Sequence, residues 1–153
     1  MKKLKKLDLS YNEISNINIL ENVNFEKLKV LDLRGNEISD INILEKANFK
    51  EIKELYLNSN GISDINILEK VNFKKLKILD LSYNGISDIN ILGKVNFKEV
   101  ETINLSNNKI VFFNININII EKANFKELKE LNLSNNKIPN FYIKNLIDKI
   151  IIK

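Results

Sequence analysis

A segment of about 24 residues recurs along this chain of 153 residues with little change in its sequence. Its first apolar column is spaced by 24, 24, 24, 24 and 28 residues, at Leu4, Leu28, Ile52, Leu76, Val100 and Leu128. A unit this short cannot bury its own apolar face, so successive units have to stack and share one core. The repetition therefore predicts a single domain of six repeats over residues 1–153, with one long repeated surface rather than one deep pocket.

Each repeat is predicted to begin with a short strand. Residues 31–33 alternate apolar and polar side chains, which is the period of two that a strand shows. One such strand per repeat, always in the same direction, predicts a parallel sheet. An asparagine follows each strand, and its amide can bond the backbone of its own turn and of the neighbouring repeat. We interpret this column as structural: Asn12, Asn36, Asn60, Asn84, Asn108 and Asn136.

The second half of each repeat is predicted to be helical. Ile41, Leu44 and Ala47 are three residues apart, as on one helix face, and predict one to two turns over residues 41–48. The pair Asn42 and Glu45 has the spacing of a capping box. A phenylalanine then recurs in successive repeats, which predicts a stacked aromatic spine between the helices and the sheet: Phe25, Phe49, Phe73, Phe97 and Phe125.

The pattern Leu-x-x-Leu-x-Leu-x-x-Asn-x-Ile, first seen over residues 4–14, occurs six times and resembles the leucine-rich repeat. The segment Ile-Ser-Asp-Ile-Asn-Ile-Leu, at 38–44, 62–68 and 86–92, is similar to the internalin-type and phosphatase-regulator-type branch of that family. The resemblance covers residues 4 to about 143. It implies an α/β solenoid shaped as a horseshoe, with a parallel β-sheet on the concave face and short helices on the convex face. Family members mostly bind proteins on the concave sheet, which implies a non-enzymatic protein–protein interaction module.

Two departures from the pattern lead to further expectations. The fifth repeat is 28 residues long, and its extra residues, within 111–120, are expected to bulge on the convex side. Internalin-like proteins protect their ends with dedicated segments, and here only residues 144–153 have the spacing of a capping helix. The uncapped first repeat would expose Leu4, Leu7 and Leu9 beside a bare sheet edge. A self-assembling unit, either a homodimer or a filament, is therefore the alternative function, and a segment of a longer array is also open.

The composition argues against an enzyme. The chain has neither cysteine nor histidine, so it offers no thiolate nucleophile, imidazole base, disulfide or Cys/His metal site. It also lacks a phosphate-binding glycine-rich loop and a nucleophile elbow. Asp8, Asp32 and Asp80 could suggest a cation site, but calcium sites in repeat proteins have denser oxygen clusters. We expect an acidic ladder beside lysines, with no cofactor and no metal.

Charge and hydropathy restrict the partners. The predicted concave columns carry seven positive residues (Lys5, Lys6, Lys29, Arg34, Lys53, Lys77, Lys129) and six negative ones (Asp8, Asp32, Glu54, Asp80, Glu101, Glu130). This near balance is a poor match for nucleic acid, which requires many uncompensated cations. The sequence shows neither a signal peptide nor an apolar run long enough to span a membrane, so we expect a cytoplasmic protein that binds no membrane. Asn, Ile and Lys make up about half of the chain, which indicates an AT-rich source such as a protozoan, a bacterium or a large DNA virus.

Residues that deviate between otherwise similar repeats are candidates for partner binding. The single arginine, Arg34, and three of the four tyrosines lie in the predicted concave columns. Tyrosine and arginine are enriched at the residues that dominate binding energy in interfaces, although tyrosine also favours strands. Together with two neighbouring aspartates, the predicted partner-binding residues are Tyr11, Asp32, Arg34, Tyr56, Asp80 and Tyr83.

Overall fold

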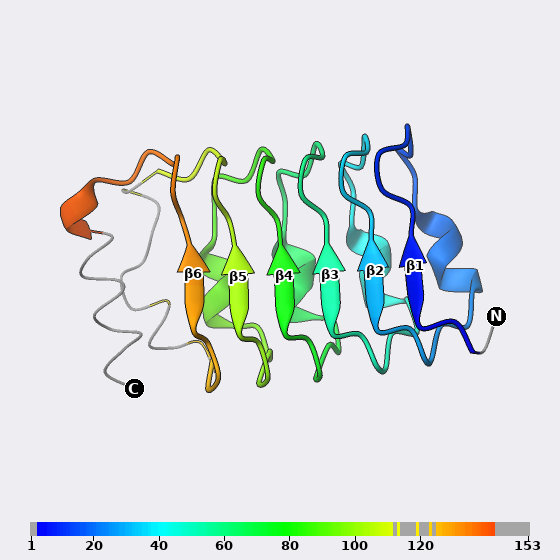
Figure 1. The fold of residues 1–153 in the computed structure, drawn as a ribbon. Coiled ribbons are helices and arrows are strands. Elements are labelled where there is room, and N and C mark those ends of the chain that lie inside the picture. Colours follow the sequence, from blue (N-terminus) through cyan, green and yellow to red (C-terminus); the bar gives the residue numbers. More distant parts are fainter. Residues whose placement is uncertain (1–2, 112, 114–118, 120–122, 124, 143–153) are drawn as a thin grey trace.

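Six short strands, one from each repeat, form a single parallel sheet (Figure 1). The computed structural model describes residues 3–111, 113, 119, 123 and 125–142. The sheet runs in sequence order, so each strand pairs with the strands of the adjacent repeats, which confirms the predicted topology. The strands are β1 (Lys6–Asp8), β2 (Val30–Asp32), β3 (Glu54–Tyr56), β4 (Ile78–Asp80), β5 (Thr102–Asn104) and β6 (Glu130–Asn132).

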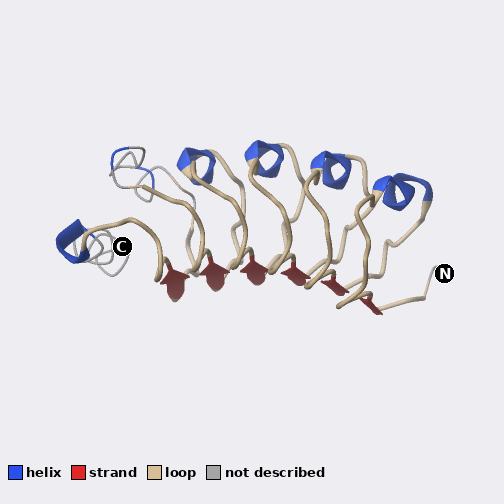
Figure 2. Cartoon of the chain, turned by 90° about the horizontal axis from the view of Figure 1, so that it is seen from above, coloured by secondary structure: helices blue, strands red, loops and turns tan. Residues whose placement is uncertain are grey.

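Short helices cover one face of the sheet and leave the other face open (Figure 2). Four of them are 3₁₀ helices: η1 (Asn18–Asn22), η2 (Asn42–Glu45), η3 (Asn66–Glu69) and η4 (Asn90–Gly93). The strands lie closer together than the helices do, so the sheet lines the concave side of a shallow arc (Figure 2). This arrangement confirms the predicted horseshoe, although the helix of the second repeat is tighter and shorter than the turns expected over 41–48.

The core lies between these two layers and continues through the repeats. Leu31, Leu55 and Leu79 are completely buried and pair with one another in register across β2, β3 and β4. The phenylalanine of each of the first five repeats is buried, and the rings of Phe25 and Phe73 lie 6.1 and 6.2 Å from that of Phe49, centroid to centroid. Such distances are typical of aromatic contacts, and the predicted aromatic spine is confirmed.

The asparagine column joins each turn to the repeat before it. The Nδ2 of Asn84 donates to the carbonyl of Leu57 at 3.0 Å and to that of Leu81 at 3.2 Å. Its Oδ1 accepts from the backbone N of Ile62 at 2.9 Å. The same pattern recurs at Asn36, Asn60, Asn108 and Asn136. These hydrogen bonds satisfy buried backbone groups that strand pairing leaves without a partner. The interpretation of the asparagine column as structural is confirmed.

The predicted capping box is wrong. Asn42 is the first residue of η2 rather than its N-cap, and the N-cap position is Ile41, which makes no side-chain capping bond. Instead the Oδ1 of Asp40 accepts from the backbone N of Asn42 at 2.8 Å. An aspartate readily bonds the backbone two residues ahead, and this local bond fixes the entry to the helix. Asp64 and Asp88 do the same, so η4 forms even though Gly93 replaces the glutamate.

The structure describes the N-terminal end of the array more fully than the C-terminal end. The pairing of Ile103 with Leu131 keeps β5 and β6 in register despite the longer fifth repeat. Most of the predicted bulge within 111–120 and all of the capping helix predicted at 144–153 lie outside the described residues. At the other end, β1 pairs with β2 alone among the described strands, and Leu4 is 37% exposed. In the described part of the chain, every helix is too short or too polar to cross a membrane.

Candidate protein-binding surface

Arg34 is held in one orientation on the concave face. Its Nε donates to both carboxylate oxygens of Asp32, at 2.8 and 2.9 Å, and its Nη2 donates to Oδ2 of the same group. The Cζ of Arg34 lies 4.8 Å from the ring centroid of Tyr56, in a cation–π contact. The hydrogen bonds that Arg34 donates to Asp32 raise the pKa of Arg34 further above its ordinary value, so the guanidinium is always charged. Asp32, which the sequence placed among the predicted contact residues, is only 3% exposed and bonds the guanidinium of Arg34.

An apolar centre surrounds Tyr56. Val30 and Ile78 are half-buried at outward-facing positions of the strands on either side of β3. The Tyr56 hydroxyl donates to Oε2 of Glu54 at 3.1 Å, and burial, followed by this bond, raises the pKa of Tyr56. Val30 and Ile78 were not among the predicted site residues. Their signal in the sequence was an apolar residue in a column that otherwise carries charged and polar side chains.

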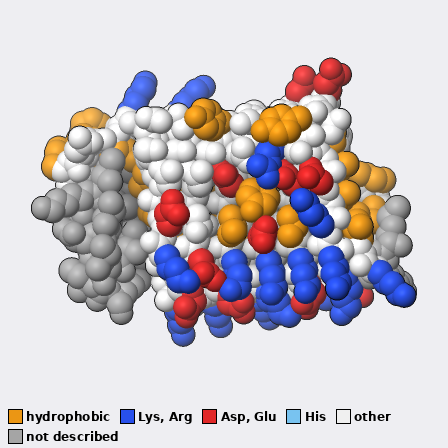
Figure 3. Space-filling view, in the orientation of Figure 1, with side chains coloured by type: hydrophobic (Ala, Val, Ile, Leu, Met, Phe, Trp, Pro, Cys, Tyr) orange, Lys and Arg blue, Asp and Glu red, His pale blue; other side chains and the backbone are white. Residues whose placement is uncertain are grey.

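Tyr11 and Tyr83 lie at the turn that follows each strand. Their backbone φ angles are 54° and 53°, in the left-handed region, and their side chains are 76% and 59% exposed. Hydrophobic side chains are visible along this upper rim in Figure 3. Gly35 has the same position in the second repeat with a φ of 64°. A Cβ added there would lie 2.5 Å from Cδ1 of Tyr11, so the tyrosine ring rests directly against this glycine.

The aspartates of the middle column take part in turns. The Oδ1 of Asp80 accepts from the N of Ser82 at 2.9 Å and from its Oγ at 2.7 Å, and Asp8 bonds Ser10 in the same way. The strands that carry these aspartates set the distances between them. Tyr56 lies between Asp32 and Asp80 in the strand pairing. Within the described residues, no three acidic side chains gather in a way that could hold a metal ion. Each of the three aspartates accepts a hydrogen bond from the backbone N two residues ahead and so contributes to its own turn.

A row of lysines crosses the sheet below the apolar centre (Figure 3). In its later part the positive charge is partly compensated, because the fifth repeat has Glu101 in the lysine column. The two Glu101 oxygens accept from the Nζ atoms of Lys77 and Lys129, each at 2.6 Å. These hydrogen bonds, that of Lys129 first, lower the pKa of Glu101 to about 2. Positive and negative groups are therefore distributed unevenly along this face. The nearly equal totals of positive and negative residues in the sequence did not reveal this distribution.

Glu101 gives a testable pH dependence. We expect its carboxyl to titrate near pH 2 in NMR spectra of the side-chain carboxyl carbon, rather than near its ordinary value of 4.5. Because the folded pKa lies below the unfolded one, the stabilisation from these ion pairs is complete above about pH 4.5 and is lost as the pH falls towards 2. Lys129→Gln should return the pKa towards 4.5, whereas Lys109→Gln, at an exposed lysine of the same repeat, should leave it in place. A Glu101 pKa near 4.5 in the unaltered protein would contradict these short contacts.

Comparison with known proteins agrees with this architecture. The family model described as two copies of leucine-rich repeats matches residues 2–46, 26–70 and 50–94, and the single leucine-rich repeat model matches residues 127–149. These matches cover more than half of the chain. The chain belongs to the leucine-rich repeat family. Proteins of this family generally act as protein-interaction modules and are typically non-enzymatic scaffolds. A search of curated proteins gave no match.

Several solved leucine-rich repeat structures have a similar fold. An internalin (InlF) from Listeria monocytogenes is 25% identical with a TM-score of 0.61, and the match covers 95% of this chain and 46% of the internalin. A leucine-rich repeat protein from Leptospira interrogans is 24% identical with a TM-score of 0.75, over 97% of this chain and 36% of that protein. The plant peptide hormone receptor RGFR1, in complex with RGF2, is 24% identical with a TM-score of 0.68, over 95% of this chain and 23% of the receptor. The chain thus spans less than half of the length of each of these three relatives.

Proposed function

We propose that this leucine-rich repeat chain is a non-enzymatic module that binds a partner protein on its concave sheet. The exposed tyrosines at left-handed backbone positions are the observation on which the proposal rests. An L-residue in this region costs about 1–2 kcal/mol relative to its usual conformations, a cost that glycine avoids. The chain uses glycine at the same place in its second repeat, at Gly35. Tyr11 and Tyr83 are largely exposed, so burial in the chain itself does little to offset the cost.

The surroundings of the two tyrosines support a binding surface. Tyrosine and arginine supply a large share of the binding energy in protein interfaces, and they act best around a well-packed apolar centre. Here the half-buried side chains of Val30, Tyr56 and Ile78 provide such a centre. Arg34 lies above it in a fixed orientation, so little conformational freedom remains to be lost on binding. We assign Asp32 a positioning role beneath Arg34, and Asp80 a similar role in shaping the turn through Ser82.

The binding test uses glycine rather than alanine at the tyrosine positions. Tyr11→Gly with Tyr83→Gly removes both rings and also relieves the backbone, so the variant should fold at least as well as the unaltered chain. Ser59→Gly is the matched control, because Ser59 has a φ of 56° at the same turn position and carries no ring. Arg34→Ala is unsuitable, since it would leave the buried Asp32 carboxylate without its cation.

The readout is quantitative capture of proteins from an extract of the source organism on the immobilised chain. Proteins captured by the unaltered chain should be retained by Ser59→Gly and reduced about tenfold or more by the double tyrosine variant, as for the loss of two interface anchors. Equal capture by all three chains would refute the proposed surface. Circular dichroism of each variant confirms that the fold is retained.

Self-association through the N-terminal end is the alternative function. The free edge of β1 and the exposed Leu4 favour it, because unpaired edge strands and apolar side chains invite contact with a second copy. Leu7 and Leu9 would contribute less to such a contact than Leu4, since both are half-buried against the core. A molecular mass that rises with concentration in light scattering, and returns to the monomer value in Leu4→Lys, would favour this alternative over the concave surface.

A further inference from the structure

The lysine row is uncompensated in the first three repeats. Lys5, Lys29 and Lys53 occupy equivalent positions, and the backbone N of each later one donates to the carbonyl of the one before it at 2.8 Å. Neighbouring parallel strands lie about 4.8 Å apart, so these side chains leave the sheet close together and their positive charges repel one another. No residue that the structure describes forms an ion pair with any of the three.

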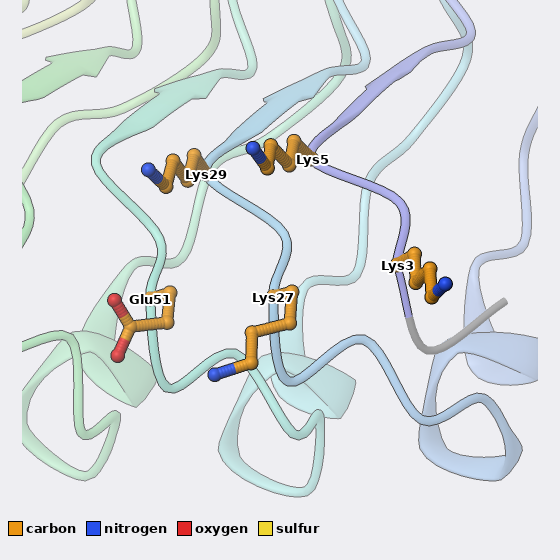
Figure 4. Close-up of a pocket in the computed structure, with 5 residues that line it drawn as sticks. All are labelled: Lys3, Lys5, Lys27, Lys29 and Glu51. Carbon is orange, nitrogen blue, oxygen red and sulfur yellow. The ribbon is translucent and has the colours of Figure 1, made fainter.

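A second group of lysines lies beside this part of the row (Figure 4). A shallow pocket of about 420 Å³ is lined by Lys3, Lys5, Lys27, Lys29 and Glu51. The side chains of Lys5 and Lys29 run parallel to each other, and the amino group of Lys27 points towards Glu51 (Figure 4). Both oxygens of Glu51 already accept from Lys75 Nζ at 2.8 Å. The one carboxylate at this pocket is therefore committed to another lysine.

The later repeats show how this row holds a carboxylate. Glu101 replaces the lysine in the fifth repeat and lies between Lys77 and Lys129, with one oxygen 2.6 Å from each ammonium nitrogen. Lys77 is equivalent to Lys53, Lys29 and Lys5, so the same kind of hydrogen bond from a lysine ammonium is available to a carboxylate from outside at the start of the row. The chain thus carries an internal copy of the contact that an acidic ligand would make.

We infer that Lys5, Lys29 and Lys53 bind an acidic segment of a partner protein, whose aspartate or glutamate side chains accept hydrogen bonds from these lysines as Glu101 does from Lys77 and Lys129. The inference rests on the proposed function, because it adds the partner's chemistry to the same concave sheet. Lysine is a compact point charge suited to single carboxylates, whereas phosphorylated segments are usually recognised by clusters of arginine. The chain's one arginine, Arg34, is already paired with Asp32.

A nucleic acid fits this row less well than an acidic peptide. The three lysines span only about 10 Å across neighbouring strands, which is enough for two or three anionic groups. Beyond Lys53 the row carries Glu101 beside its two remaining lysines, so a long polyanion gains less attraction there than at the first three repeats. Single-stranded nucleic acids also stack their bases on aromatic side chains, and the exposed Tyr11 and Tyr83 lie past the opposite ends of the strands.

The test is fluorescence anisotropy of the full chain with a labelled peptide of about ten residues in which glutamate and serine alternate, an extended segment with its carboxylates on one face. The row variant is Lys5→Gln, Lys29→Gln and Lys53→Gln. The matched control is Lys46→Gln, Lys70→Gln and Lys94→Gln, which removes the same charge from three exposed lysines that follow the helices η2, η3 and η4. Glu101→Lys adds a variant in which the uncompensated row is longer.

The row variant should bind the peptide about tenfold more weakly than the unaltered chain, and the control should lose less than about twofold. Glu101→Lys should bind it more tightly, and added salt should weaken binding in every case. Equal losses in the two lysine variants would overturn the inference, as would tighter binding of an oligothymidylate of the same charge. The double tyrosine variant separates the two proposals: if it loses partner capture while the row variant still binds the peptide normally, the concave surface stands and the acidic segment falls.

Discussion

Replacing Leu79 with alanine is expected to lower the free energy of unfolding by about 3 kcal/mol, within the usual range for a buried leucine. Leu79 is completely buried in the middle of β4 and pairs with Leu55 and Ile103 on the adjacent strands. The substitution removes apolar contacts and leaves a cavity. The neighbouring repeats cannot close it readily, because the hydrogen bonds of the sheet fix their spacing. Urea unfolding followed by circular dichroism gives the measurement.

Leu7→Ala is the matched control for this substitution. Leu7 occupies the same column in β1, but it is only half-buried and has a strand on one side alone. Its loss should cost about 1 kcal/mol, because less apolar surface returns to water and solvent can fill the space. Equal costs at the two positions would contradict a core that the repeats share, and would indicate repeats that fold independently.

The core could be predicted from the sequence because there are few ways to bury apolar residues that recur at the same place in each repeat. An apolar residue at the same place in every repeat, such as Leu31 or Leu55, can be shielded only by the equivalent residue of the next repeat. The parallel direction of the strands, their order and their register all follow from this requirement. The longer fifth repeat confirms it, since the pairing of Ile103 with Leu131 is kept despite four additional residues between them.

The hydrogen bond at the start of the helix could not be predicted in the same way, because the sequence offers two alternatives there. The sequence offers both Asn42 with Glu45 as a capping box and Asp40 as an acceptor two residues before Asn42. Both patterns satisfy known preferences, and the short 3₁₀ helix selects the second. A helix of only one or two turns is too short for its own sequence to determine where it begins and ends.

The exposure of the candidate residues could be predicted only in part, because the pairing of side chains within one strand depends on rotamers that the sequence pattern does not show. Asp32 and Arg34 are two residues apart and were both predicted to contact a partner. In the structure the guanidinium covers the carboxylate, so one of them is presented and the other is hidden. The totals of positive and negative residues also did not show where on the sheet the charges lie. Nearly equal numbers of cations and anions do not imply evenly mixed charges, and here Glu101 pairs with the lysines at one end of the row, whereas those at the other end form no ion pair among the described residues.

Asn84→Ala is expected to destabilise the fold by about 2 kcal/mol, a cost typical of one buried donor left without an acceptor. The carbonyls of Leu57 and Leu81 would retain a donor after the substitution, because the Nδ2 atoms of Asn60 and Asn108 also reach them. The backbone N–H of Ile62 would lose the side-chain oxygen that accepts its hydrogen bond. We therefore expect most of the cost to arise at this single group, inside the neighbouring repeat rather than at the substituted turn.

Asn12→Ala separates this effect from the loss of an asparagine in general. Asn12 holds the same position in the first repeat and donates to the carbonyls of Leu9 and Ser10, but in the described chain no backbone N–H donates to its Oδ1. Its replacement should cost less than about 1 kcal/mol, since both carbonyls can turn to water or to other donors. Hydrogen exchange adds a local readout: the amide of Ile62 should exchange faster in Asn84→Ala and at its normal rate in Asn12→Ala. Similar costs and unchanged exchange in both variants would mean that the asparagine column closes turns individually and does not couple one repeat to the next.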